Sequence, residues 1–242
     1  MRILAFDTAT NATTVALSGA GDSVLEARHD PEAGARPGHA THLLPLAAEL
    51  LERAGIGWDA LDRVAVGIGP GTFTGLRIGI ASARALGRAS GTPLVGISTL
   101  HSLALAAGGS PISTQIDSVI AVIDARRGEA FAAAWRLAEI EDLQGALLAP
   151  AAFVPDELAR RVADLGGRSL AVGDGAVLFR SVLERSGAFV PGDDSELHRV
   201  RAAVHCLIAE RLPGTELGQV RPLYLRPPDA KPTFGRSAVA KP

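Results

Sequence analysis

The chain has 242 residues, 47% of them hydrophobic, with a formal net charge of −2. It can bury a sizeable core, as one large domain or two smaller lobes, but its balanced charge does not favour strong autonomous nucleic-acid binding. No apolar run reaches the roughly 18 residues of a membrane span, and Asp7 comes too early for a signal peptide. The single cysteine, Cys206, excludes an internal disulfide and fits a reducing compartment. We therefore expect a cytoplasmic protein that does not contact a membrane.

Three short strands are predicted at the start of the chain. Apolar segments at 2–7, 13–18 and 23–28 are separated by short polar turns, a pattern typical of antiparallel strands. Apolar residues then follow helical spacing over 39–54. Pro45 is expected near the first turn of that helix, where the missing amide is tolerated.

A glycine-rich stretch at 67–79 is the most distinctive part of the sequence. A predicted strand at 62–68 runs into Gly-Pro-Gly, and a helix follows to about Ser90, capped by Thr72 or Thr74. A strand, a glycine turn and a helix N-terminus together predict an anion site. Free amides and the positive end of the helix dipole converge there.

Small residues recur at every fourth position of this helix, at Gly75, Gly79, Ala83 and Gly87. Glycine costs about 1 kcal/mol relative to alanine inside a helix. Three glycines on one face therefore indicate that another backbone comes close. Two interpretations stay open, namely packing on the chain's own sheet or against a helix of another subunit.

The order of elements then starts again. After a strand at 93–97 and a helix ending near Ala107, residues 108–111 form a predicted linker. The elements predicted beyond it are strands at 118–124, 129–137 and 143–149, a helix at 155–165, a strand at 170–172 and helices at 176–186 and 196–211. The predicted fold is thus α/β, with the order β-β-β-α-β-α occurring twice and the second copy reduced. We expect lobes at 1–107 and 108–226 and a mobile tail at 227–242.

Five segments resemble a known family: 1–10 (MRILAFDTAT), 69–79 (GPGTFTGLRIG), 96–100 (GISTL), 123–129 (IDARRGE) and 222–226 (PLYLR). They span nearly the whole chain and look like the TsaB (YeaZ-like) family, which is related to the TsaD or glycoprotease (peptidase M22-like) group. The resemblance implies an actin-like ATPase, ribonuclease H-like fold of two related lobes.

The resemblance also implies a function in making threonylcarbamoyladenosine on tRNA. The chain would be a non-catalytic subunit that pairs with TsaD, joined by the small ATPase TsaE, and it would meet tRNA only through that complex. Without TsaD it would form a homodimer. The alternatives left open are an actin-like ATPase or sugar/acetate-kinase-type phosphotransferase and, with less support, a glycoprotease-type peptidase.

The sequence offers little for catalysis or metal binding. The two histidine ligands of the TsaD metal motif fall here on Thr99 and Leu103, and neither replaces imidazole. His101 is expected to be structural, and His39 and His42 lack an evident third ligand. Cys206 lies in a segment typical of a buried helix, and we expect a structural thiol there. No catalytic residue, metal or cofactor of its own is therefore predicted.

Two sets of site residues are predicted. A vestigial nucleotide site, which leaves weak ATP or ADP binding open, comprises Asp7, Thr8, Gly69, Gly71, Thr72, Asp124, Gly173, Asp174 and Gly175. The partner interface comprises Leu43, Leu46, Leu50, Gly75, Ile78, Gly79, Ser82, Ala83 and Leu86. A local tRNA-contacting patch that involves Arg77, Arg126 or Arg127 is also left open.

Overall fold

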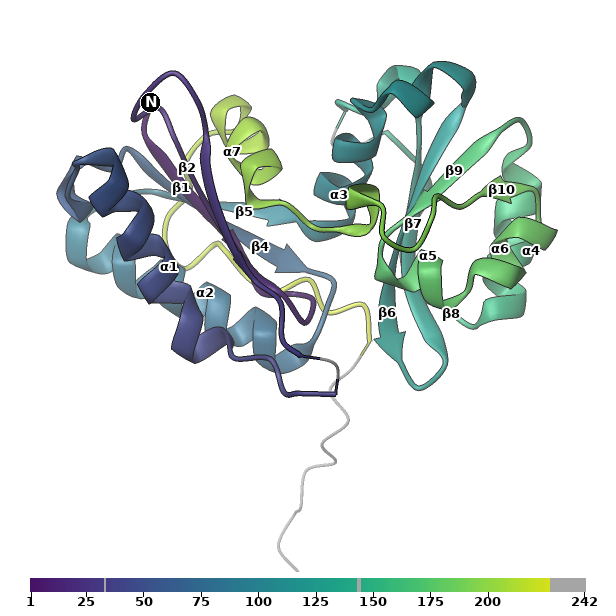
Figure 1. Cartoon of the computed structure of the whole chain (residues 1–242), viewed down its shortest axis with the longest axis horizontal. Coiled ribbons are helices and arrows are strands. Elements are labelled where there is room, and N and C mark those ends of the chain that lie inside the picture. The colour runs from purple at the N-terminus through teal and green to yellow at the C-terminus, as the bar shows by residue number, and fades with distance from the viewer. Residues whose placement is uncertain (33, 143–144, 227–242) are drawn as a thin grey trace, which may run out of the picture.

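The computed structural model describes residues 1–32, 34–142 and 145–226. Two lobes lie side by side, each built on a five-stranded sheet (Figure 1). The tail predicted at 227–242 lies outside the described residues. Among the helices that are described, none is long and apolar enough to cross a membrane.

The first sheet joins an antiparallel meander to two parallel strands. Its strands are β1 (Ile3–Asp7), β2 (Thr13–Ser18), β3 (Leu25–His29), β4 (Arg63–Gly69) and β5 (Leu94–Ser98), in the order β3-β2-β1-β4-β5. Helices α1 (His39–Ala54) and α2 (Phe73–Ser90) share a hydrophobic cluster with this sheet. β1 is buried along its whole length, as expected for a central strand covered on both faces.

The second sheet repeats this arrangement with longer antiparallel strands but with shorter helices and shorter final strands. Its strands are β6 (Ser118–Arg126), β7 (Glu129–Arg136), β8 (Ala146–Phe153), β9 (Ser169–Val172) and β10 (Ala188–Phe189), in the order β10-β9-β6-β7-β8. The helices α4 (Pro155–Leu165), α5 (Asp174–Leu178) and α6 (Arg180–Arg185) belong to this lobe. The predicted α/β fold of two related lobes, the second reduced, is confirmed.

Two helices cross between the lobes. α3 (Thr99–Gly108) leaves the first sheet and packs its leucines on the second, against β6 and β7. α7 (Ala202–Arg211) does the reverse and covers the first sheet, where Cys206 and Ile208 meet Ile3 and Val95 (Figure 1). The predicted lobe boundaries are therefore wrong for these two helices, because each is buried on the sheet of the other lobe.

Several predicted elements shift for local reasons. The helix expected at 196–211 begins at Ala202, because Ser195 caps a separate 3-10 turn, Glu196–His198. The helix expected at 176–186 is divided at Phe179 into α5 and α6. Pro45 lies in the second turn of α1 rather than the first, on its exposed side. The strand expected at 143–149 appears as β8, and positions 143–144 themselves lie outside the described residues.

Candidate functional site

Asp7, at the end of β1, is almost completely buried, with an exposed fraction of 1%. Its Oδ1 atom accepts a hydrogen bond from the Ala9 amide at 2.6 Å. Its Oδ2 atom accepts one from the Thr99 hydroxyl at 2.7 Å and lies 3.0 Å from His205 Nε2. Both carboxylate oxygens are therefore engaged inside the protein.

This contact continues to a serine. Ser102 Oγ lies 2.9 Å from His205 Nδ1, so that Ser102, His205 and Asp7 form a chain across α3, α7 and β1. The residue types match those of a hydrolase triad. However, the serine and the imidazole have exposed fractions of 1% and 0%, and the imidazole turns Nε2, not Nδ1, toward the carboxylate. A substrate cannot reach this serine, so we assign the chain a structural role.

The electrostatics of Asp7 agree with this role. Burial by itself would raise its pKa. The hydrogen bond and the charge of His205, with those from the Ala9 amide and the Thr99 hydroxyl, outweigh burial and hold the pKa below its usual value. Asp7 is thus an ionised carboxylate at neutral pH that is already satisfied by protein partners.

The glycine loop before α2 closes on the first lobe. The Thr72 amide donates to the Ala9 carbonyl at 2.7 Å, and the Gly75 amide donates to Thr72 Oγ1 at 3.3 Å. Thr72 is therefore the N-cap, as one of the two expectations had it. A Cβ atom at Gly71 would lie 2.3 Å from the Ala9 carbonyl oxygen. Glycine is needed here because the loop packs directly on the β1–β2 turn.

At the matching end of the second lobe, Asp124 is held by Arg126. The guanidinium contacts Asp124 Oδ2 at 2.9 Å through Nη1 and donates to Asn11 Oδ1 at 2.7 Å through Nη2. This second bond joins the β6–β7 turn to the β1–β2 turn. The Asp124 amide donates to Asp174 Oδ1 at 3.1 Å, and Asp174 itself is exposed.

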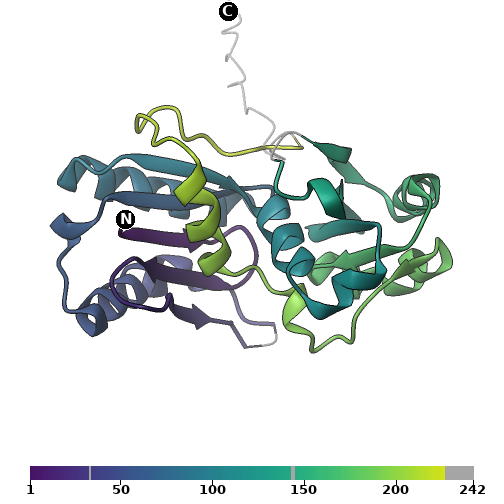
Figure 2. The same cartoon turned by 90° about the horizontal axis from the view of Figure 1, so that it is seen from above.

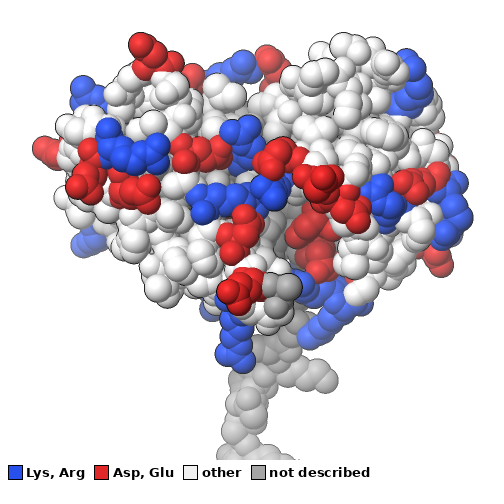
Figure 3. All heavy atoms as spheres, in the orientation of Figure 1, with Lys and Arg blue, Asp and Glu red and all other residues white. Residues whose placement is uncertain are grey.

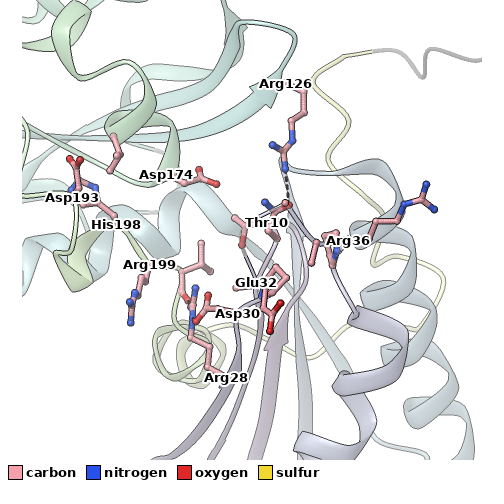
Figure 4. A pocket seen from close by; sticks show the side chains of 18 residues that line it. Thr10, Arg28, Asp30, Glu32, Arg36, Arg126, Asp174, Asp193, His198 and Arg199 are labelled. Carbon is pink, nitrogen blue, oxygen red and sulfur yellow. Dashed lines mark hydrogen bonds and ion pairs between the residues drawn. The ribbon is translucent and has the colours of Figure 1, made fainter.

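A pocket of about 710 Å³ opens between the lobes (Figure 4). Thr10, Asn11, Arg28, Arg126 and Asp174 are part of its wall, which mixes cationic and anionic side chains. Among the residues predicted for a nucleotide site, Asp174 lines this pocket, whereas Asp7, Thr8, Gly69, Gly71 and Thr72 do not. The structure thus separates the first-lobe half of that predicted set from the open cavity.

Gly173 and Gly175, the second-lobe glycines of the predicted nucleotide site, are needed for packing. Gly173 has a φ of +108°, and a Cβ atom there would lie 2.1 Å from the Val122 carbonyl oxygen. At Gly175 a Cβ atom would lie 2.8 Å from the Ile123 carbonyl carbon. Both positions allow the start of α5 to lie directly on β6. Nucleotide binding by this chain stays a prediction.

The small residues of α2 face the chain's own sheet. A Cβ atom would lie 1.9 Å from the Thr8 carbonyl oxygen at Gly75 and 2.5 Å from Thr8 Oγ1 at Gly79, and Ala83 is fully buried. On α1, Leu43 and Leu50 are buried in the same cluster. The partner-interface prediction is therefore wrong for Leu43, Leu50, Gly75, Gly79 and Ala83. Leu46 and Leu86 pack partly against this core, and Ile78 and Ser82 are half-buried.

The outward side of the same two helices presents small or apolar residues beside the charged Glu49, Glu52 and Arg53 of α1 and Arg88 of α2. Its exposed small or apolar residues are Ala40, Leu44, Pro45 and Ala48 on α1 and Ala81, Ala85 and Ala89 on α2. Leu44 has an exposed fraction of 44%. The surface around α2 is mostly white in Figure 3. We call these seven residues the α1–α2 face.

The histidines weighed as metal ligands have other partners. His101 Nε2 lies 2.7 Å from the Ile140 carbonyl oxygen, and its ring tilts against Trp135. His39 Nδ1 contacts Thr13, whereas His42 stacks on His29, so the two turn to different neighbours. Within the described ranges there is no cluster of three metal-ligating side chains. Burial raises the pKa of the Cys206 thiol to about 12, as fits a structural residue.

Comparisons with known proteins agree on one group. The family model for TsaD, tRNA N6-adenosine threonylcarbamoyltransferase, matches residues 29–163. The tRNA threonylcarbamoyladenosine biosynthesis protein TsaB of Escherichia coli is 34% identical over 187 residues, which cover 77% of each chain. The protein of the same name from Haemophilus influenzae is 37% identical over 131 residues, 54% of this chain and 52% of that one.

The same group appears among solved structures. A Pseudomonas aeruginosa protein described as similar to peptidase YEAZ superposes with a TM-score of 0.74 at 29% identity, covering 93% of this chain and 99% of the other. YeaZ from the same organism gives a TM-score of 0.70 at 27% identity, with coverages of 92% and 100%.

Proposed function

Because the chain belongs to the TsaB (YeaZ-like) family, it has a role in making threonylcarbamoyladenosine on tRNA, and we propose that this role is non-catalytic. In this proposal the chain pairs with a threonylcarbamoyltransferase of the TsaD type. A TsaE-type ATPase joins the pair, and the chain forms a homodimer when the transferase is absent.

The state of the polar groups at the strand ends supports a non-catalytic subunit. Asp7, the first-strand carboxylate of the predicted nucleotide site, has both oxygens engaged by Ala9, Thr99 and His205. The serine of the Ser-His-Asp chain is closed to solvent. The peptidase alternative therefore has no support from this serine, because a substrate cannot reach it.

The α1–α2 face supports the pairing, and it carries this proposal. Small side chains on two neighbouring helices let partner helices approach closely. Exposed apolar residues at the centre of such a face gain free energy when a partner removes them from water. The predicted partner helices are thus retained in this proposal, but the contact is moved from their inner side to their outer side.

The test replaces Ala85, at the middle of this face, by a long charged side chain. Light scattering after gel filtration should show a one-to-one complex of the wild-type chain with its TsaD-type partner. Ala85→Arg should weaken that complex by about a hundredfold, a loss typical of a blocked interface centre, while the melting temperature stays unchanged. Ala163→Arg is the matched control, because Ala163 is exposed on α4 of the other lobe.

Two results would contradict the proposal. A wild-type chain that forms no complex at micromolar concentrations would rule out the pairing. Complexes of equal affinity for Ala85→Arg and Ala163→Arg would show that the partner binds elsewhere.

A further inference from the structure

Two aromatic rings and an arginine form an exposed cluster beside the start of α2. The guanidinium carbon of Arg77 lies 3.7 Å from the centre of the Phe73 ring. The Phe73 and Tyr224 rings are 5.4 Å apart between centroids, and Arg77 Nε donates to the Tyr224 hydroxyl at 3.3 Å. Phe73 and Tyr224 have exposed fractions of 38% and 41%. We call these three residues the aromatic–arginine platform.

The segment that carries Tyr224 runs from the first lobe to the second (Figure 2). The Leu223 amide donates to the Ile68 carbonyl at 2.8 Å on the first lobe. On the second lobe Arg226 contacts Glu129 at 2.7 Å and donates to the Ala125 carbonyl at 3.0 Å. The platform is thereby connected to the β6–β7 turn, which contains Arg126 and Arg127.

This part of the chain is basic, although the whole chain is not. Arg77 contacts two uncharged groups, the Phe73 ring and the Tyr224 hydroxyl. The described end of the chain, residues 221–226, includes Arg221 and Arg226 and no acidic residue, in a chain of net charge −2.

Surfaces that bind single-stranded nucleic acid combine exposed aromatic side chains with nearby cationic side chains. Bases stack on aromatic side chains whatever their sequence, and arginines neutralise the phosphates between them. An arginine placed over a ring can also offer its guanidinium plane for stacking. The sequence left open a local tRNA-contacting patch that involves Arg77, Arg126 or Arg127, and the segment 223–226 links Arg77 to the turn that carries the other two.

We propose that the platform, together with Arg126, Arg127 and Arg226, binds a single-stranded part of the tRNA substrate. One base stacks on the exposed ring of Phe73 or Tyr224, and the arginines contact neighbouring phosphates. This inference rests on the proposed function, since it takes tRNA as the molecule presented to the assembly, and it adds a direct RNA contact by this subunit.

The platform and the α1–α2 face are different surfaces of α2. Arg77 and Arg84 reach toward the C-terminal segment, where Arg84 donates to the carbonyls of Leu217 and Val220. Ala85 lies about 80° further round the helix from Arg77. RNA and a protein partner can therefore bind together, and the two contacts can be tested apart.

The experiment measures fluorescence anisotropy of a labelled tRNA transcript that has adenosine beside its anticodon. The transcript is titrated with the full chain alone and with the chain bound to its TsaD-type partner. The variants are Arg77→Glu and Tyr224→Ala, and the matched control is Arg160→Glu, an exposed arginine on α4. Pairing without RNA is measured in parallel by light scattering.

We expect Arg77→Glu and Tyr224→Ala each to weaken tRNA binding by about tenfold, as loss of a phosphate contact or a stacked base does. Arg77→Glu should also lower the slope of log K against log salt by about 0.7 to 1. Arg160→Glu should change binding by less than about twofold, and all variants should pair normally.

Two results would overturn the proposed RNA contact, and a third would overturn the proposed function alone. Wild-type affinity for tRNA in both platform variants would overturn the inference and leave the proposed pairing intact. A loss of pairing without RNA in Arg77→Glu would assign the platform to a protein contact instead. If the wild-type chain fails to pair but the platform variants still lose tRNA binding, the proposed function fails and the RNA contact stands.

Discussion

At the scale of single residues, Asp7 joins three elements that are far apart in the sequence. Its carboxylate, at the end of β1, meets Thr99 of α3 and His205 of α7, and the imidazole reaches Ser102. In the sequence, Asp7 could be selected only by its position at the end of a predicted apolar strand. Its partners could not be predicted, since no local motif connects residues 92 and 198 positions away.

We predict that Asp7→Asn lowers the free energy of unfolding by about 3 kcal/mol, because it removes one member of a buried charge-assisted network and leaves the others without their partner. Guanidinium titration at pH 7 is the measurement. Asp164→Asn, on the exposed side of α4, is the control and should change stability by less than about 0.5 kcal/mol.

The pH dependence of this loss follows from the direction of the pKa shift. The folded pKa of Asp7 lies below the ordinary value of 3.8, so its stabilisation is complete above that value and disappears as the pH falls through the folded pKa. The stability difference between the wild-type chain and Asp7→Asn should thus shrink as the pH falls below about 4. A difference that grows on acidification would contradict this assignment.

At the scale of elements, α2 shows what a sequence pattern can and cannot decide. The repeat of Gly75, Gly79 and Ala83 correctly predicted a close approach of another backbone. It could not tell which backbone, because packing on the own sheet and on a partner helix require the same small side chains. The contacts of Thr8 with both glycine positions answer that question in favour of the own sheet.

We predict that Ala83→Leu destabilises the fold instead of selectively blocking a partner. Ala83 is fully buried between α2 and its sheet, and extra methyl groups in a filled core cost about 1 to 3 kcal/mol. Thermal unfolding followed by circular dichroism should show a clearly lower melting temperature. Ala85→Leu, two residues along on the exposed side, should leave it nearly unchanged. Equal melting temperatures for the two variants would contradict the packing described for α2.

Element boundaries were predictable where side chains carry the signal. The helix over 39–54 and the one over 155–165 match α1 and α4 residue for residue, since apolar spacing and flanking glycines or acids mark both. The region 176–211 was less predictable. There the chain forms short helices and a capped turn whose limits depend on contacts such as the His198 ring with Gly173 and Pro191.

At the scale of the whole molecule, each lobe depends on a helix supplied by the other. Ala202, Val204 and Cys206 of α7 complete the core above Ile3 and Ala5 of the first sheet. An arginine on β4, Arg63, donates to the Ala209 carbonyl near the end of α7 at 2.5 Å. The sequence predicted two lobes from the repeated order of elements. It could not predict this exchange, because an apolar helix face does not specify which of two similar sheets it covers.

The exchange predicts that the first lobe cannot fold by itself. A fragment of residues 1–107 leaves the face of β1, β4 and β5 that α7 covers open to water, and it also leaves the apolar residues of α3 without the second sheet. An exposed apolar surface of that kind favours aggregation or a poorly packed state. Proton–nitrogen correlation spectra of the fragment should show narrow, overlapping signals without a cooperative melt. Co-expression with residues 108–242 restores α7 and should give a stable two-piece protein with dispersed signals. A fragment 1–107 that melts cooperatively by itself would show that α7 is dispensable, and the lobes would then be independent folding units.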